Sequence, residues 1–480
     1  MAIDSPLDLS LDRVSEAAED LRIALGAENV HFDGPVLERA ALATVPNARR
    51  PVAVVFPGRT AELQAVMRIA QRHRVPVWPV SSGRNWGYGS GTPVHHGAIV
   101  INLSRLNRII EVNAELAYAV VEPGVTYRAL RAHLEQHHPE LWCDCTDGPP
   151  DGSVIGNALD RGIGVTHYAD HFATLCGLEV VLPDGSLVRT GGGPSDCETW
   201  HLHKWGVGAY TEGLFSQSNM GVVTRAGVWL MPKPEAFVSF TFDLADPSKL
   251  PMLIDTVRDL ALRGVLSSAG HVINDIVTLS VLTQYPAHLI DGHSRLPDAL
   301  RTELCDRYRV PSWSFGGGLQ GSRVQVRAAR AGMRAALAPL GKLEFIDDRK
   351  VSLVRALLRI ADMPRWQNVA AWLAKAVTGR SIEIIAAAPH IHSVLQGRPS
   401  DYFVRHAYFK SRVPKPDRAD PDRDRCGLIW FAPVVPMTGT HVRKVLDLTA
   451  PLFVQYGFDH YAALLIQNPR AMIVLMSIFF

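Results

Sequence analysis

A glycine-rich loop with one arginine is the first segment of the sequence whose residue types could perform chemistry. Residues 81–93 read SSGRNWGYGSGTP and follow the apolar stretch VPVWPV (75–80), which we expect to be a strand. Glycine permits backbone conformations with positive φ, and successive N–H groups of such a loop can surround an anion. Arg84 could add a fixed positive charge or a bidentate contact. The spacing is neither GxGxxG nor GxxxxGK[ST], so the loop predicts a phosphate site of another kind.

Three more loops of this texture follow. They are VEPGVT (121–126), DGSVIGNALDRGIG (151–164) and LFSQSNMGVVT (214–224). Each loop alone is explained equally well as an ordinary turn between strands. Four of them within one part of the chain favour a long ligand that contains a diphosphate.

The elements that must position these loops alternate between strand and helix over the first ~235 residues. Expected strands are 51–56, 75–80, 97–103 and 117–124, a hairpin spans 178–190, and one strand covers 221–234. Expected helices are 60–73, with Thr60 as N-cap, and 126–137. Beyond a boundary near 235 we expect a second α+β domain, with a strand over 237–244 and helices over 249–264 and 324–341. The charged, Pro-rich segment 410–425 is expected to be a solvated loop.

Composition is that of an ordinary soluble globular enzyme. The 480 residues are 47% hydrophobic and 20% charged, which together with the length predicts two or more domains. The net charge of +2 predicts no nucleic-acid or membrane partner. Six cysteines without a CxxC pair argue against a disulfide framework or a zinc site. With no secretory signal or membrane-spanning run in view, we expect a cytoplasmic protein.

The motifs together resemble a known family. VEPGVTY, GSVIGNALDRGIG, DHFATLCGLEVVLPDGSLVRTG and GLFSQSNMGVVTRAGVWLMPKP, with the opening loop, are similar to the vanillyl-alcohol oxidase and 4-cresol dehydrogenase family. The resemblance extends from about residue 45 to the C-terminus and includes PSWSFGGGLQG, IWFAPVVP and QYGFDHYA. It implies the two-domain α+β fold of FAD-linked oxidases, with a p-cresol-methylhydroxylase-type FAD-binding domain over 1–235 and a substrate-binding cap domain over 236–480.

The resemblance also implies which residues bind FAD. The loop 81–93 would surround the pyrophosphate, residues 122–124 would lie along the flavin, and the two later loops would complete the cofactor site. The implied cofactor-binding residues are Ser82, Gly83, Arg84, Asn85, Gly89, Glu122, Pro123, Gly124, Gly152, Ser153, Gly156, Asn157, Gly221 and Val223.

Candidate catalytic residues follow from the same resemblance. Tyr88 matches a tyrosine that hydrogen-bonds a substrate phenol, although it could instead pack the loop against the second domain. Asp147 matches an acid near the flavin N5 that acts as a base or stabilises the intermediate. Because this sequence has one extra residue before Gly152, Asp144 or Asp151 could occupy that position, and a solvated turn aspartate is the alternative. His167 could line the pocket or pack between the domains.

Three positions depart from the family pattern. Val165 stands where vanillyl-alcohol oxidase has a further active-site tyrosine, which weakens the assignment of the same phenol chemistry. Leu428 stands at the histidine position for covalent flavin attachment, and the corresponding tyrosine position falls near Ala407. We therefore expect FAD to be dissociable. The histidines at 95–96 and 201–203 have no third ligand at suitable spacing, so no metal site is expected.

The apolar end AMIVLMSIFF is the last departure. Relatives continue beyond it with a return to the FAD domain, which this sequence lacks. The chain could be a fragment, a frameshifted or degenerate copy, or a shorter enzyme. We favour a fragment or truncated product and expect poor solubility, because a buried strand left at a sheet edge would promote aggregation.

The function implied is hydride transfer from an aromatic, para-substituted phenolic substrate to FAD. Oxygen or a cytochrome c would then accept the electrons, and a homodimer is expected from the relatives. One alternative is an FAD oxidoreductase of a hydroxy acid or another non-phenolic alcohol, which Val165 favours and Tyr88 opposes. The other is a truncated, inactive FAD-binding homologue.

Overall fold

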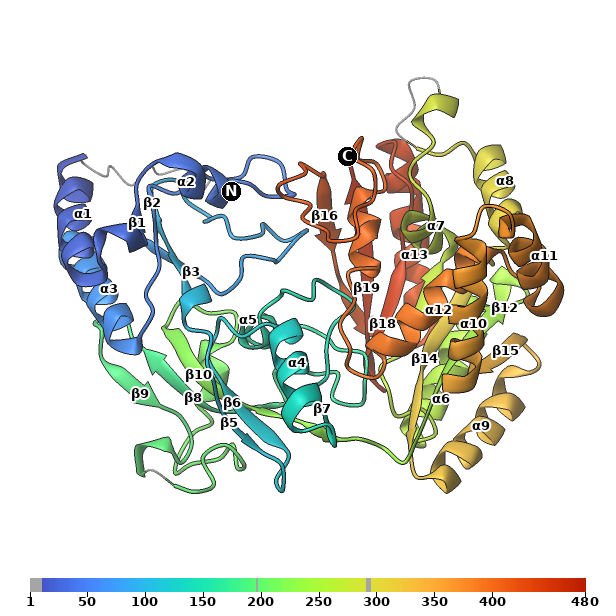
Figure 1. Cartoon of the computed structure of the whole chain (residues 1–480), viewed down its shortest axis with the longest axis horizontal. Coiled ribbons are helices and arrows are strands. Elements are labelled where there is room, and N and C mark those ends of the chain that lie inside the picture. The colour runs from blue at the N-terminus through green and yellow to red at the C-terminus, as the bar shows by residue number, and fades with distance from the viewer. Residues whose placement is uncertain (1–10, 196, 291–294) are drawn as a thin grey trace.

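Two domains lie side by side in the computed structural model, which describes residues 11–195, 197–290 and 295–480 (Figure 1). The first sheet has the order β1 (Val30–His31), β2 (Ala53–Val55), β4 (Ile99–Asn102) and β3 (Val77–Val80). β2, β4 and β3 are parallel and β1 is antiparallel. The helices of this part are α1 (Leu11–Leu25), α2 (Gly34–Ala40) and α3 (Thr60–His73). The glycine loop follows β3 at its carboxyl end, where ligands bind in open parallel sheets.

A second, antiparallel sheet completes the first domain. Its order is β5 (Ile109–Asn113), β6 (Tyr118–Val121), β10 (Val222–Trp229), β8 (Leu175–Val181) and β9 (Leu187–Arg189). A small ribbon pairs β11 (Met231–Pro232) with β7 (Leu141–Trp142), and the helices are α4 (Tyr127–His137) and α5 (Val154–Leu159). In this sheet, loop 121–126 begins at the end of β6 and loop 214–224 leads into β10, whereas loop 151–164 surrounds α5.

The second domain is built on a large antiparallel sheet. Its order is β15 (Gly341–Ile346), β12 (Ala236–Leu244), β14 (Trp313–Gly321), β13 (His271–Asn274), β18 (Ala463–Asn468), β19 (Ala471–Phe479) and β16 (Leu428–Phe431), and β17 (Val434–Pro436) also pairs with β19. The chain changes from the first domain to this sheet between β11 and β12, at the predicted boundary near residue 235.

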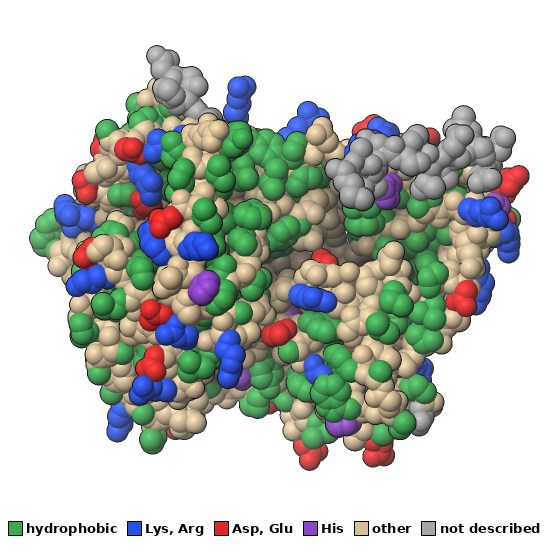
Figure 2. All heavy atoms as spheres, turned by 180° about the vertical axis from the view of Figure 1, so that it is seen from behind, with side chains coloured by type: hydrophobic (Ala, Val, Ile, Leu, Met, Phe, Trp, Pro, Cys, Tyr) green, Lys and Arg blue, Asp and Glu red, His purple; other side chains and the backbone are tan. Residues whose placement is uncertain are grey.

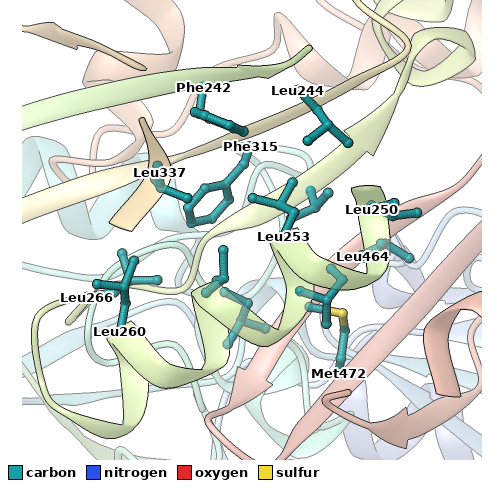
Figure 3. Close-up of a cluster of buried hydrophobic side chains, with 14 of the residues drawn as sticks. Phe242, Leu244, Leu250, Leu253, Leu260, Leu266, Phe315, Leu337, Leu464 and Met472 are labelled. Carbon is teal, nitrogen blue, oxygen red and sulfur yellow. The ribbon is translucent and has the colours of Figure 1, made fainter. Parts of the chain in front are cut away.

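Helices cover both faces of the large sheet. On one face, α6 (Leu250–Leu262), α9 (Arg323–Leu337) and α13 (Gly439–Gln455) enclose an apolar core. Leu253 of α6 meets Phe242 and Phe315 there, and all three are fully buried (Figure 3). The remaining helices are α7 (Asp275–Leu282), α8 (Asp298–Tyr308), α10 (Asp348–Ala361), α11 (Gln367–Thr378) and α12 (Ile382–Val394). Successive side chains of a strand point to opposite faces of the sheet. The residues that alternate with the core residues therefore lie on the second face of the large sheet.

The C-terminal strand is buried, as its composition predicts, but it is not a sheet edge. β19 pairs with β18 on one side and with β16 and β17 on the other. Met472 and Val474 are fully buried in the core. The expectation of an unpaired edge was wrong, and with it the physical reason given for poor solubility.

The segment 410–425 is only partly the solvated loop that its composition predicted: residues 412–414, 417 and 418 are exposed, but Pro421 and Asp422 are buried. Asp422 is only 3% exposed and accepts hydrogen bonds from Trp86 Nε1 (2.9 Å) and Ser90 Oγ (2.6 Å) of the glycine loop. Asp420 pairs with Arg84 (3.1 Å) and Arg39 (2.6 Å) of the first domain. The acidic residues therefore join the two domains, because their partners lie more than 300 residues away in the sequence.

The surface charges, the cysteines and the helices show no further specialised feature in the described residues. Lys, Arg, Asp and Glu side chains are interspersed over the surface seen in Figure 2. All six cysteines are free. None of the helices in the described residues is long and apolar enough to cross a membrane. The same residues contain no group of three or more His, Cys, Asp and Glu side chains that could hold a metal ion.

The buried carboxyl of Asp422 gives the stability of the protein a specific pH dependence. Burial raises its pKa from 3.8 to about 6, despite the hydrogen bonds from Ser90 and Trp86. A raised carboxyl pKa means that the folded protein holds the proton more tightly than the unfolded chain. The contribution of Asp422 is therefore fully present below pH 3.8 and is lost as the pH rises through 6. Relative to Asp422→Asn, the wild type should lose about 1 kcal/mol of unfolding free energy between pH 5 and pH 7.

Urea unfolding of the two proteins at both pH values measures this difference. Asp417→Asn, at an exposed position of the same loop, serves as the control and should show no such change. A pH-independent difference between wild type and Asp422→Asn would contradict the prediction.

Candidate active site

A large cavity lies between the glycine loops of the first domain and the second face of the large sheet. Its volume is about 1980 Å³, whereas ligand pockets typically measure roughly 300–1,000 Å³. Seen from behind, the surface is hollowed near its centre, between the two halves (Figure 2). The cavity therefore has room for a long cofactor together with a substrate.

The glycine loop reaches this cavity in a conformation that requires glycine. Gly83, Gly87 and Gly89 have φ values of 66°, 85° and 108°. A Cβ on Gly91 would lie 3.3 Å from the Cα of Gly83, and one on Gly87 would lie 2.9 Å from the ring of Trp430. The loop thus folds on itself and presents backbone to the cavity, as the sequence predicted for a phosphate-binding loop.

Ser153 connects two of the other glycine loops. Its hydroxyl donates to the carbonyl of Pro123 (2.6 Å) and accepts from the N–H of Gly156 (2.8 Å). A Cβ on Gly156 would lie 3.0 Å from the hydroxyl of Ser81, at the start of the first loop. Segments that are far apart in the sequence therefore converge on one wall of the cavity.

Most of the predicted cofactor-binding residues line this wall. They are Ser82, Gly83, Arg84, Asn85, Gly89, Pro123, Gly152, Ser153, Gly156, Asn157, Gly221 and Val223.

Glu122 and Gly124 do not line the cavity. Glu122 is buried and pairs with Arg108 (2.7 Å). A Cβ on Gly124 would lie 2.7 Å from the carbonyl oxygen of Leu106, so this glycine allows a close backbone crossing. Of the residues that do line it, Arg84 directs its guanidinium to Asp420. The predicted phosphate contact of Arg84 therefore competes with an ion pair between the domains.

Beside the glycine loop, side chains from both domains form an aromatic wall. The ring of Tyr88 packs edge-on against Trp430 (5.3 Å between centroids), Trp430 stacks with His406 (5.9 Å), and His406 packs against Tyr461 (6.1 Å). All four residues line the cavity. We call this region, together with Asp147 and His271, the aromatic end.

Asp147 faces the aromatic end from a loop of the first domain. Its Oδ2 lies 3.8 Å from His271 Nδ1 on β13, and both residues line the cavity. Neither of the two alternative aspartates, Asp144 and Asp151, lines the cavity. Asp144 is buried and accepts from the N–H groups of Cys145 (2.8 Å) and Val165 (3.2 Å). Asp151 is held by one arginine of each domain, Arg128 and Arg418.

The surroundings of Asp151 show why it is unsuited to the position near the substrate. Burial alone would raise its pKa, but the ion pairs with Arg128 (2.8 Å) and Arg418 (2.9 Å) outweigh this and lower it. Of the three carboxyls that the sequence left open, only Asp147 therefore reaches the cavity without a bound arginine.

Burial keeps the other groups at the aromatic end uncharged. It raises the pKa of Tyr88, whose ring is half exposed to the cavity, and that of Tyr461, where the charge of Asp147 adds to the effect. It lowers the pKa of His271 and of His406 more than the nearby Asp147 restores it. His406 Nδ1 lies 2.7 Å from the carbonyl of Phe403, to which it donates. Two protonated phenols and two neutral imidazoles therefore surround one carboxylate.

His167 is not brought to this site. It is exposed, contacts Gln320 of the second domain and packs against Tyr168 (4.5 Å), and it is absent from the cavity wall. The alternative role of packing between domains agrees with this position.

The three positions that depart from the family pattern also lie at the cavity. Val165, Ala407 and Leu428 all line the cavity, and none of these side chains can form a bond to a flavin. Tyr408, beside Ala407, is fully buried and donates its hydroxyl to Asp424 (2.6 Å). Dissociable binding of the cofactor stays a prediction that these side chains favour.

Sequence reasoning missed His271, His406, Trp430 and Tyr461. Trp430 and Tyr461 lie within the quoted motifs IWFAPVVP and QYGFDHYA, which gave a signal for importance but not for a role. His271 could have been suggested only by alternation along β13, because Val272 faces the core and its neighbour must face the other side.

Comparisons with known proteins agree with this site. Residues 51–191 match the family described as FAD binding domain. The chain is 37% identical over 474 residues to 1'-carboxy-chondrochloren decarboxylase of Chondromyces crocatus, covering 97% of this chain and 84% of that protein. It is 32% identical over 333 residues to the 4-cresol dehydrogenase [hydroxylating] flavoprotein subunit of Pseudomonas putida, covering 67% of this chain and 62% of that protein.

The solved structure of 4-ethylphenol oxidase from Gulosibacter chungangensis, in an isoeugenol complex, superposes with a TM-score of 0.84. It shares 27% sequence identity, and the superposition covers 99% of this chain and 84% of that one. The fold is therefore the two-domain α+β fold of FAD-linked oxidases, the cofactor is FAD, and the protein is an FAD-dependent oxidoreductase. The chain belongs to the vanillyl-alcohol oxidase and 4-cresol dehydrogenase family.

Proposed function

We propose that this oxidoreductase removes a hydride from the benzylic carbon of a para-substituted phenol. The observation that carries the proposal is the meeting of Tyr88 and Asp147, from two loops of the cofactor domain, with the aromatic wall of the second domain. A flat ring with one polar end suits such a wall, because aromatic pairs gain from edge-on and offset packing.

The cavity fits the cofactor on its own geometry. The close approach of Gly83 and Gly91 leaves a cradle that a side chain would fill, and loops 81–93 and 152–157 would hold the diphosphate. Gly221 and Val223 would bound it from the later strand. When bound there, FAD accepts the hydride and its electrons pass on to oxygen or to a cytochrome c.

Tyr88 would bind the oxygen of the substrate phenol. Because burial raises its pKa, its hydroxyl stays protonated at neutral pH and can donate to a phenolate. A donor aimed at developing negative charge stabilises the ionised ring from which a hydride leaves more readily. Among the six residues of the aromatic end, the neutral hydroxyl of Tyr88 would supply this stabilisation.

Asp147 would act at the opposite end of the ring. Its carboxylate faces the neutral imidazole of His271 rather than an arginine, so it is free to stabilise positive charge that develops as the hydride leaves, or to accept a proton. His271 would hold the carboxylate on the side of the sheet.

A second candidate reaction follows from the relative that matches almost the whole chain, which is named as a decarboxylase. In a para-hydroxyphenylpropanoate, one hydride could leave the benzylic carbon while the bond to the carboxylate carbon breaks. The electron pair of that bond would form an alkene and carbon dioxide would leave. The same residues would serve both reactions, and the substrate would decide between them.

The first prediction concerns Tyr88. Tyr88→Phe should keep the flavin spectrum of the purified protein and lower kcat/KM for para-ethylphenol by about 10²-fold, as expected for the loss of one donor to an oxyanion. Stopped-flow reduction of the flavin under anaerobic conditions measures the rate. Tyr168→Phe, outside the cavity, is the matched control and should behave as the wild type. Equal rates in both variants would remove Tyr88 from the mechanism.

The second prediction concerns the choice among aspartates. Asp147→Asn should reduce the rate of flavin reduction by about 10²- to 10⁴-fold. Asp151→Asn should lose ion pairs with Arg128 and Arg418, and therefore stability, but retain the rate. The reverse order of the two effects would show that Asp147 was wrongly assigned.

The third prediction separates the two candidate reactions. With para-hydroxyphenylpropanoate, decarboxylation should yield para-vinylphenol and carbon dioxide in equal amounts, one of each for every flavin reduced. Mass spectrometry of the products of one anaerobic turnover measures this. Flavin reduction with all carbon retained would exclude the decarboxylation and leave simple dehydrogenation.

A further inference from the structure

The cavity continues past the aromatic end along the second face of the large sheet. One row of residues crosses the second face of the large sheet in strict register: Ile473 lies opposite Leu465, Leu465 opposite His271, His271 opposite Gly316, Gly316 opposite Thr241, and Thr241 opposite Glu344. Every member of the row lines the cavity. Since adjacent strands lie about 4.8 Å apart, the cavity extends about 14 Å beyond His271. We call this extension, over β14, β12 and β15, the side arm.

Residues with small side chains form the floor of the side arm. Ser239 and Thr241 of β12 and Ser314 and Gly316 of β14 face it, whereas the residues that alternate with them fill the core. A Cβ on Gly316 would meet no atom nearer than the carbonyl oxygen of Phe240, at 3.6 Å. The space above Gly316 is therefore open, and a larger side chain there would project into it.

The roof of the side arm is mostly apolar. Its cavity-lining side chains come from α10, α11 and α12, which pack against one another. The apolar ones include Leu353, Val354, Leu357, Leu373, Val377, Ile384, Ala387, Ala388 and Ile391, and Lys350 and Thr378 are the polar ones. Leu353 and Val377 are 71% and 79% exposed, so the apolar roof continues to the outer surface. Apolar surface of this extent is stabilised when a ligand covers it.

The charged groups that line the far end of the side arm are Arg380, Glu344 and Lys350, and each has a partner within the protein. Lys350 Nζ donates to the carbonyl of Phe345 (2.7 Å). Arg380 forms an ion pair with Asp243 (2.6 Å), and Glu344 forms one with Lys342 (2.5 Å). A charged ligand would have to compete with these pairs, whereas an uncharged chain need not disturb them. The charges therefore favour an apolar occupant.

We propose that the side arm binds an extended, uncharged apolar substituent carried by the aromatic substrate. The aromatic ring would lie at the aromatic end, and its para substituent would pass His271 and run over Gly316 beneath α10–α12. This inference deepens the proposed function and rests on it for the position of the ring. Each fully buried methylene would improve affinity by at most roughly fourfold, so a chain of several methylenes would dominate binding.

A series of para-alkylphenols from ethyl to decyl tests the proposal on the FAD-loaded enzyme. Equilibrium binding is followed by the change in the flavin spectrum and reduction by anaerobic stopped flow. In the wild type, Kd should fall at least tenfold from ethyl to decyl. Gly316→Leu, which fills the floor, and Ala388→Leu, which fills the roof, should abolish most of that gain. Ala356→Leu, at an exposed position of α10 outside the cavity, should keep it.

The two ideas fail in different ways. A Kd that does not depend on chain length, or a dependence that survives both filling variants, would overturn the side arm while leaving phenol oxidation intact. Binding that strengthens with chain length but never reduces the flavin would support the side arm and overturn the proposed reaction. The flavin content of Gly316→Leu and Ala388→Leu shows whether each variant has folded. If one of them does not fold, the other alone completes the test.

Discussion

The position of Tyr88 against the second domain depends on the contact between the glycine loop and the buried carboxyl of Asp422. Trp86 and Ser90 each donate to one of its oxygens, and Arg39 lies 3.8 Å away. Removing a carboxylate from water is expensive, and the raised pKa of Asp422 shows that its partners only partly offset this cost. The contact therefore contributes geometry more than stability. It fixes Gly87 against Trp430, and so places Tyr88 at the aromatic end.

The large sheet gives the other half of the site its rigidity. One set of alternating side chains is held in the apolar core beneath α6, α9 and α13, which leaves the intervening set no freedom to move. His271 and Leu465 belong to that second set and face the cavity. Groups on strands hold their positions more closely than groups on loops. The first domain therefore supplies Tyr88 and Asp147 from loops, and the second supplies a fixed wall against which they are positioned.

Local patterns predicted the elements well, but contacts between distant segments could not be read from them. The helix over 60–73 was found at its observed bounds, with Thr60 as its first residue rather than its N-cap, because its apolar spacing is regular. Residues of all four glycine loops line the cavity, and their contacts to FAD stay a prediction. The burial of Asp422 in segment 410–425 was missed because charge and proline indicate solvent exposure unless a distant partner is known. Glu122 and Gly124 failed for a similar reason, since their neighbours at 103–108 determine that they face away.

The charges at the aromatic end favour one orientation of a bound phenol. Asp147 is the one carboxylate among its six residues, and a phenolate brought close to it would be repelled. Burial raises the pKa of both tyrosines, and the charge of Asp147 adds to the shift at Tyr461, so Tyr88 is the donor less affected by that charge. The phenol oxygen is therefore favoured beside Tyr88. The para substituent then points toward Asp147 and His271, which is the side from which the side arm begins. The same electrostatic constraint that orients the ring for hydride loss thus directs its substituent over Gly316.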